Sequence, residues 1–267
     1  MTQKHFADRI ALTRADTHLW TGDADRYFGN GVERQFGGWV GAAMLKAVTA
    51  DAKPDHHPRA LVTHFLSGVT HAPITIRTKP MREGRSVSYW QAEMIQNDAV
   101  CAHAVITLGE LREDSQAHTG SSMPVAVGPD APGLMRFKPL APFADELDAR
   151  WIEGTPFAND DEAGRSLLWS RGAAGQRLDL AGLAFLADFV PPRVFYVSKS
   201  FVPTSTLSMT VYFHAKREEI EAVGEDFVLV EARGRRIEGG YWDHSASFWS
   251  PHGPLLMTSE QLAQHRG

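Results

Sequence analysis

Apolar residues recur along this chain in two periods, one typical of helices and one typical of strands. Nearly every position from Leu178 to Val190 is apolar, and these residues repeat at helical spacing. Asp179 stands where an N-cap residue would, and Pro191-Pro192 prevent a helix from continuing. The pattern therefore predicts a buried helix over residues 179–190.

A second helical pattern covers Gln35–Val48, and the segments around both helices alternate between apolar and polar residues as strands do. Asn97-Asp98 separates two such segments and predicts a tight hairpin. Strands are expected once or twice between Ile10 and Asn30, and at Ala60–Val69, Ile74–Met81, Ser86–Gln96, Ala99–Leu108, Ala149–Ile152, Leu167–Arg171, Ser205–His214, Phe227–Ile237, Gly240–Trp249 and Leu255–Thr258.

The same order of elements occurs twice, a buried helix and then long antiparallel strands. From Glu110 to about Pro142 the periodicity stops and charged residues give way to Ser, Gly and Pro, as in a long connection between compact units. An element order that repeats at about half the chain length indicates two tandem copies of one unit. We therefore expect two α+β units, residues 1–110 and 146–267, joined by a linker at 111–145.

The composition argues against several classes of protein. A formal net charge of −5 disfavours a general binder of nucleic acid or of anionic membranes, because such proteins need a basic surface. No stretch approaches the ~18 consecutive apolar residues of a membrane span, and the first residues lack the apolar core of a signal peptide. Cys101 is the only cysteine, so no intrachain disulfide can form. A soluble, cytoplasmic protein is expected.

Common catalytic and cofactor motifs are missing from the sequence. It contains no Gly-x-Ser-x-Gly elbow, no phosphate-binding loop ending in Gly-Lys-Ser/Thr and no Gly-x-Gly-x-x-Gly after a strand. The 12 histidines are scattered without the spacing of a zinc site. Neither a metal ion nor a cofactor is expected.

One carboxylate interrupts the apolar helix, because Asp188 projects from the same stripe as Leu180 and Ala184. Asp188 is either turned to water in a frayed last turn or is a buried, functional acid. Thr206 opens the strand that follows the helix, and Gln261 lies just past the last predicted strand. Taken alone, the threonine could be an ordinary strand residue and the glutamine a solvated residue of the tail.

Three segments of the second half and one of the first carry a family resemblance. They are Leu-Ala-Asp188-Phe-Val-Pro-Pro, the strand Pro203–His214, the C-terminal Tyr241–Gln261, and Phe36–Gly41 at the start of the first helix. Together they resemble the acyl-CoA thioesterase II family, over most of the chain outside the linker. The resemblance implies an α+β double hotdog fold, in which two tandem antiparallel sheets are each wrapped round a long central helix.

The resemblance also implies a catalytic set of Asp188, Thr206 and Gln261. Asp188 would accept a proton from a water molecule that attacks a thioester carbonyl, while the other two side chains hydrogen-bond that water. Burial against the apolar residues of the helix is expected to raise the pKa of Asp188 towards neutrality.

Two further groups are candidates for substrate binding. Gly37-Gly38 at the start of the first helix could present backbone N–H groups to an oxyanion, or could simply allow the helix to pack closely on the sheet. Arg233 and Arg235, which form the densest basic cluster with Arg236, could pair with the phosphates of coenzyme A or could mark a solvated strand end.

The predicted function is hydrolysis of acyl-CoA thioesters to free fatty acid and coenzyme A, a reaction of lipid metabolism. The alternative is a non-hydrolytic protein that binds or senses acyl-CoA with the same fold. A hotdog enoyl-CoA hydratase would require an Asp/His helix motif that this sequence lacks. By analogy with other hotdog proteins, a homodimer or a higher homo-oligomer is expected.

Overall fold

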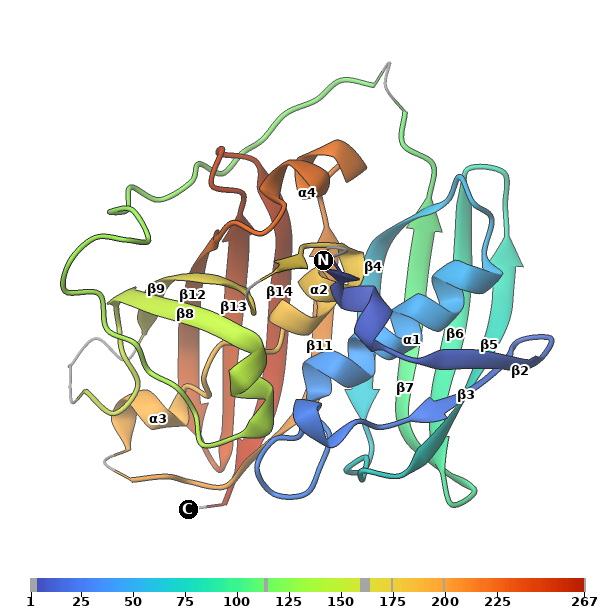
Figure 1. Ribbon diagram of the computed structural model, residues 1–267, viewed down its shortest axis with the longest axis horizontal. Coiled ribbons are helices and arrows are strands. Elements are labelled where there is room, and N and C mark those ends of the chain that lie inside the picture. The colour runs from blue at the N-terminus through green and yellow to red at the C-terminus, as the bar shows by residue number, and fades with distance from the viewer. Residues whose placement is uncertain (1–3, 113–114, 159–163, 174, 199, 267) are drawn as a thin grey trace.

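Twelve strands form one antiparallel sheet that runs through both halves of the chain (Figure 1). The computed structural model describes residues 4–112, 115–158, 164–173, 175–198 and 200–266. The strand order is β2-β3-β5-β6-β7-β4-β11-β14-β13-β12-β9-β8. The strands are β2 (Leu12–Asp16), β3 (Leu19–Asp23), β4 (His57–Phe65), β5 (Pro73–Glu83), β6 (Val87–Gln96), β7 (Ala99–Gly109), β8 (Leu147–Glu153), β9 (Arg165–Gly172), β11 (Thr204–Phe213), β12 (Val228–Glu238), β13 (Tyr241–Trp249) and β14 (Leu255–His265). A short parallel pair, β1 (Lys4–His5) and β10 (Gln176–Arg177), lies outside this sheet.

The two halves meet where β4 of the first pairs with β11 of the second. Val211 lies opposite Leu61 in this pairing, and both side chains are fully buried. The sequence pattern predicts two sheets, whereas in the structure the two sets of strands are continuous. Pairing the two edges satisfies backbone N–H and C=O groups that separate sheets would leave open.

Two helices pack against each other in front of the middle of the sheet, α1 (Gly37–Asp51) and α2 (Leu180–Leu186). The prediction of a buried helix near Gln35–Val48 is confirmed, because ten of the 15 residues of α1 are buried. Two smaller helices are α3 (Val194–Val197) and α4 (Arg217–Val223), and three 3-10 turns occur at Phe6–Arg9, Arg26–Phe28 and Pro142–Glu146. No helix among the described residues is long and apolar enough to cross a membrane.

Helix α2 is much shorter than the predicted long central helix. Its predicted N-cap is confirmed, since the Asp179 carboxylate accepts a hydrogen bond of 2.7 Å from the backbone N–H of Gly182. The helix ends at Leu186, not at Val190, and residues 187–188 form a turn. The prediction was wrong here because the chain leaves the helical path where Asp188 meets groups of three other elements, α1, β11 and β14.

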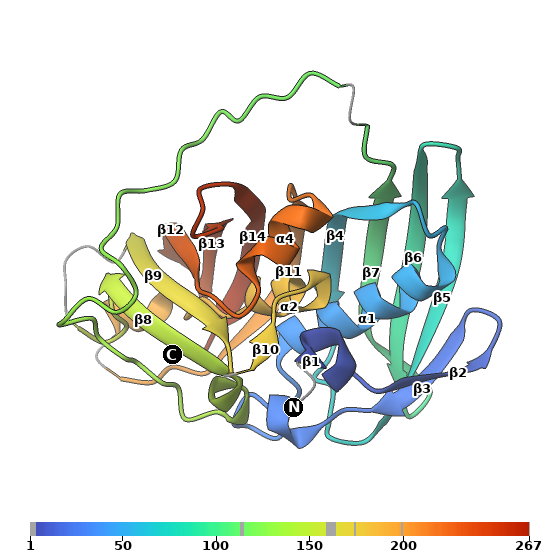
Figure 2. The ribbon, with the colours of Figure 1, turned by 45° about the horizontal axis from the view of Figure 1, so that its top comes forward.

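The sheet curves round the helices. In Figure 2 the outer strands, β8 and β9 at one end and β2 and β3 at the other, lie towards the viewer on the side where α1 and α2 pack. The main apolar core fills the space between this inner face and the helices. From residue 115 the chain runs along the outside of the molecule towards β8 (Figure 1). The Trp169 indole N–H donates a hydrogen bond of 2.8 Å to the carbonyl of Val127 in this segment.

Candidate active site

The Asp188 carboxylate is the point at which the two halves of the chain share hydrogen bonds. Oδ2 accepts the backbone N–H of Gly38, at the first turn of α1, over 2.9 Å. Oδ1 accepts a hydrogen bond from Nε2 of Gln261 on β14. The Thr206 side chain on β11 is a third hydrogen-bonding partner of the carboxylate. The structure therefore brings Asp188, Thr206 and Gln261 together with Gly38, which was predicted as an oxyanion donor and here donates to the Asp188 carboxylate.

The two glycines at the start of α1 make this contact sterically possible. A Cβ atom on Gly37 would lie 2.7 Å from Oδ2 of Asp188, and one on Gly38 would lie 2.3 Å from the backbone oxygen of Phe185. Both distances are far below a van der Waals contact, so only glycine lets α1 approach α2 and the carboxylate this closely. The ring of Phe65, at the end of β4, lies against the same position of Gly37.

Gln261 reaches Asp188 from the interior of a strand. The prediction that β14 ends at Thr258 was wrong, because the strand continues to His265. The apolar–polar alternation of a strand is hard to recognise here, because two residues of its inner face, Ser259 and Gln261, are polar. Together with Ala263 they are buried on the face towards the helices. Gln261 pairs with Met209 of β11 and with His244 of β13, and these pairings fix its side chain on that face.

Thr206 lies at an irregularity of β11. The register with β14 shifts between Thr206 and Ser208, as at a β-bulge. Bulges redirect side chains locally, and this one accompanies the contact of Thr206 with the turn after α2. Thr206 is half-buried.

Burial makes the Asp188 carboxyl group a much weaker acid than an exposed aspartic acid. Loss of water contacts raises its pKa to about 7, while the hydrogen bonds from Gln261, Gly38 and Thr206 oppose that rise. Although protein surrounds the carboxylate, Asp188 keeps some solvent-accessible surface. A carboxyl group with this pKa exchanges its proton near neutral pH, as a general base must.

The predicted phosphate-binding arginines lie elsewhere. Arg235 binds Glu260 through two contacts of 2.8 Å and Asp243 through one of 3.1 Å, and Arg233 lies 2.9 Å from Glu231. These carboxylates hold the pKa of Arg235 above its ordinary value. Glu260 precedes the inward-facing Gln261, so the Arg235 cluster occupies the opposite face of the sheet. The structure does not bring Arg233 and Arg235 to Asp188.

Sequence reasoning missed two buried polar residues on the inner face, Arg193 and His244. Arg193 is 1% exposed and His244 is fully buried. Arg193 immediately follows the paired prolines, and His244 is one of the scattered histidines, so neither belongs to a recognisable motif. Among the described residues, no group of three or more His, Cys, Asp or Glu side chains could hold a metal ion.

Comparison with known proteins finds similarity over both halves. Residues 25–109 match the acyl-CoA thioesterase N-terminal domain, and residues 119–264 match the acyl-CoA thioesterase C-terminal domain. No match was found among curated proteins.

Solved structures are similar to this chain over nearly its whole length. A protein of unknown function with a hot dog fold from Alicyclobacillus acidocaldarius is 32% identical, with 96% of each chain covered and a TM-score of 0.88. An acyl-CoA thioesterase II from Mycobacterium marinum is 17% identical, with 96% of each chain covered and a TM-score of 0.76. A tesB protein from Mycobacterium avium subsp. paratuberculosis is 18% identical over the same shares, with a TM-score of 0.78.

Proposed function

The chain belongs to the acyl-CoA thioesterase family, and from that premise we propose that it hydrolyses acyl-CoA thioesters to a free acid and coenzyme A with Asp188 as general base. The observation that supports this assignment most directly is the Asp188 carboxylate, which has a pKa of about 7 and is held by hydrogen bonds from three other elements. A base whose pKa lies near the working pH combines a large ionised fraction with a useful affinity for protons.

In the proposed reaction a water molecule donates one hydrogen bond to Asp188 and is oriented by Thr206 and Gln261. Each carboxylate oxygen has two lone pairs, so Asp188 can accept this water in addition to its hydrogen bonds with Gly38, Gln261 and Thr206. As the water oxygen bonds to the thioester carbon, its proton passes to Asp188. When the tetrahedral intermediate collapses, the C=O bond re-forms and the carbon–sulfur bond breaks. The thiolate leaves with the electron pair and takes the proton that Asp188 holds, which returns the carboxylate to its ionised form.

The negative charge on the carbonyl oxygen needs a donor in the transition state. Gly38 gives its N–H to Asp188, which leaves the N–H of Gly37 at the same helix terminus as our candidate for the oxyanion. Arg233 and Arg235 would have to exchange their carboxylate partners for phosphate oxygens before they could bind coenzyme A.

The site at Asp188, which uses residues of both halves, also supports a proposal for the domain arrangement of the chain. We propose a double hotdog arrangement of residues 1–110 and 146–267, joined by the linker at 111–145, and a homodimer or higher homo-oligomer. Support for the first comes from the contact between Gly38 of one unit and Asp188 of the other, which makes both units necessary for one site.

Thiol release from acyl-CoA, followed with a chromogenic disulfide, tests the proposed reaction. Because the base has to be ionised, kcat/KM should rise about tenfold per pH unit below the pKa of Asp188 and level off above about pH 7. Tight binding of acyl-CoA without thiol release at any pH would instead favour the non-hydrolytic binder or sensor.

Replacing Thr206 by valine removes a hydroxyl while nearly conserving shape. Thr206→Val should lower kcat more than it raises KM, because the hydroxyl is proposed to act on the attacking water and not on the bound ester. Steady-state kinetics of the two proteins across a range of acyl-CoA concentrations give both constants. An effect confined to KM would remove Thr206 from the chemical step. Thr210→Val on the same strand, facing away from Asp188 next to Glu260, is the matched control and should leave both constants unchanged.

A further inference from the structure

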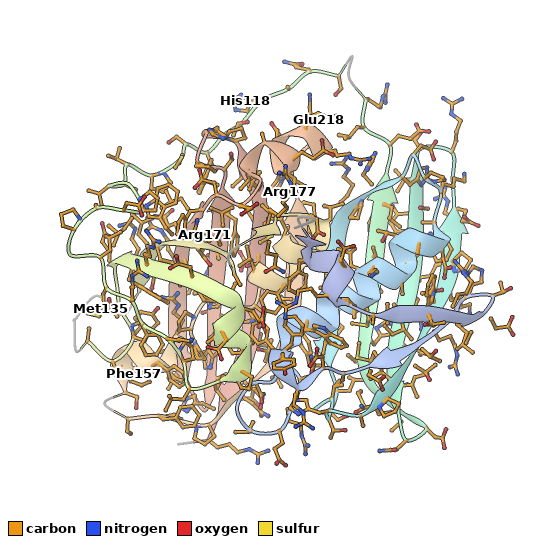
Figure 3. All side chains as sticks on the ribbon, viewed as in Figure 1. His118, Met135, Phe157, Arg171, Arg177 and Glu218 are labelled. Carbon is orange, nitrogen blue, oxygen red and sulfur yellow. The ribbon has the colours of Figure 1, made fainter. Side chains whose placement is uncertain are left out.

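The guanidinium of Arg193 is buried on the inner face of the sheet and has no charged partner in the part of the chain that the structure describes. Arg193 precedes α3, whose Phe195 stacks on Phe157 with ring centroids 5.0 Å apart. Figure 3 labels Phe157 at the end of the molecule where α3 lies. Nη1 of Arg193 donates to Oγ of Ser166 over 3.0 Å, and the guanidinium carbon lies 4.5 Å from the ring centroid of Tyr196. Nε and Nη2 are buried and have no hydrogen-bond partner.

No carboxylate among the described residues pairs with Arg193. Its pKa is lowered by burial, and Tyr196 is the group that opposes this shift. By contrast, Arg235 on the outer face has two carboxylate partners. An unpaired charge in the interior is costly, and two unsatisfied donors add to that cost. An anion bound beside Arg193 would offset both costs.

His244 extends the same polar group. Both of its ring nitrogens are buried and lack a partner. It lies opposite Gly234 in the register of β12 and β13, and the aliphatic stem of Arg193 covers Gly234, where a Cβ atom would be 2.9 Å from Cδ of the arginine. Burial and the Arg193 charge lower the pKa of His244 to about 3, so the imidazole is neutral and carries one N–H donor.

The strand register connects this group to Asp188. His244 on β13 lies directly opposite Gln261 on β14, and Gly234 on β12 lies directly opposite His244 on its other side. Adjacent strands are about 4.8 Å apart, so Gly234 and the Arg193 stem that covers it lie about two strand spacings, or about 10 Å, from Gln261 on the same face. A short acyl chain whose thioester carbonyl is at Asp188 can span that distance.

We propose that Arg193 and His244 bind a carboxylate at the far end of the acyl group, so that the preferred substrates are coenzyme A half-thioesters of short dicarboxylic acids. This inference rests on the proposed thioesterase function. The carboxylate accepts hydrogen bonds from Nε and Nη2 of Arg193 and from the neutral imidazole. A chain that ends in a methyl group leaves these donors unsatisfied, and a site built to hydrogen-bond a polar group discriminates strongly against an analogue that lacks it.

Matched substrate pairs test the proposal: succinyl-CoA against butyryl-CoA, glutaryl-CoA against pentanoyl-CoA, and adipoyl-CoA against hexanoyl-CoA. For at least one pair, kcat/KM of the unmodified protein should favour the dicarboxylic substrate on the order of 100-fold. Arg193→Met should abolish this preference and retain hydrolysis of the monocarboxylic substrates. Arg77→Met, which changes an exposed arginine on β5 that pairs with Glu93, should leave the preference intact.

Other outcomes distinguish a failure of the proposed thioesterase function from a failure of the proposed carboxylate site. Hydrolysis of none of the six thioesters would refute the proposed function itself. Equal or better hydrolysis of the monocarboxylic member of every pair, with selectivity unchanged in Arg193→Met, would overturn the inference and leave the function standing. If Arg193→Met does not fold, His244→Phe replaces it, and a preference that survives this change counts against the site.

Free dicarboxylates distinguish a substrate subsite from a site for a separate anion. Free succinate or glutarate should inhibit competitively and more strongly than butyrate, because it occupies part of the substrate site. If free dicarboxylate instead alters butyryl-CoA hydrolysis without competing with it, the carboxylate site is independent of the acyl chain and the substrate assignment is wrong.

Discussion

Asp188→Asn should lower kcat on the order of 10²–10⁴-fold while the protein remains folded. The amide is nearly isosteric with the carboxylate, so its oxygen can still accept the N–H of Gly38, and Gln261 can rotate its amide to accept from the new NH₂ group. What the variant lacks is a group that takes a proton from water. Thiol-release assays with the variant and the unmodified protein at equal concentration measure the difference.

The same substitution should make the protein more stable above neutral pH. Folding raises the pKa of Asp188 from 3.8 to about 7, so its stabilising contribution is complete below about pH 4 and is lost as pH rises through about 7. The elevation corresponds to about 4 kcal/mol of disfavoured ionisation. Asparagine avoids that cost, and the Tm advantage of Asp188→Asn should therefore be larger at about pH 8 than at about pH 5.

A matched change shows whether these effects belong to the site. Asp98→Asn lies in the exposed hairpin between β6 and β7, where Asp98 has a positive φ of 61° that asparagine tolerates well. It should change neither turnover nor the pH dependence of Tm. If Asp188→Asn kept full turnover, another residue would have to act as the base.

Local patterns in the sequence were sufficient to predict most elements but not their ends. The apolar run of α1 is a helix because it is enclosed by α2 and the inner face of the sheet, and such burial is visible in composition. The end of α2 and the length of β14 depend on partners distant in sequence. Gln261 continues a strand because β11 and β13 flank it on both sides, and nothing in residues 259–265 alone indicates this.

The three polar side chains of the site were predictable from the sequence, but the contacts between different elements were not. Asp188 is conspicuous as a charge in an apolar stripe, and the family resemblance supplied Thr206 and Gln261. The contact with Gly38 joins residues 150 positions apart, and the grouping of Arg193 with His244 arises only from strand register and from the stem of the arginine lying on Gly234. Spacing rules describe neighbours within an element, and these contacts lie between elements.

Gly38→Ala is the second change for which we expect a large effect, because it disrupts the packing of α1 of the first half against α2 of the second. The new methyl group would lie 2.3 Å from the Phe185 backbone oxygen and 2.7 Å from the ring of Phe36. A backbone carbonyl inside a helix cannot move aside as a side chain can, so α1 and α2 have to separate. Overpacking of this kind costs about 2–3 kcal/mol, which denaturant unfolding can measure.

Separation of the helices should also raise the pKa of Asp188. The Gly38 N–H stabilises the charged form of Asp188, so weakening that hydrogen bond should raise the pKa of Asp188 and move the rise of kcat/KM to higher pH. Gly41→Ala on the same helix is the control: its methyl group would meet Leu61 at 3.5 Å, an ordinary contact, and alanine favours the helix by about 0.5–1 kcal/mol. Gly41→Ala should therefore keep the pH profile and be at least as stable as the unmodified protein. An unshifted profile in a destabilised Gly38→Ala would mean that the glycine serves helix packing alone, and that the acidity of Asp188 is set by Gln261, Thr206 and burial.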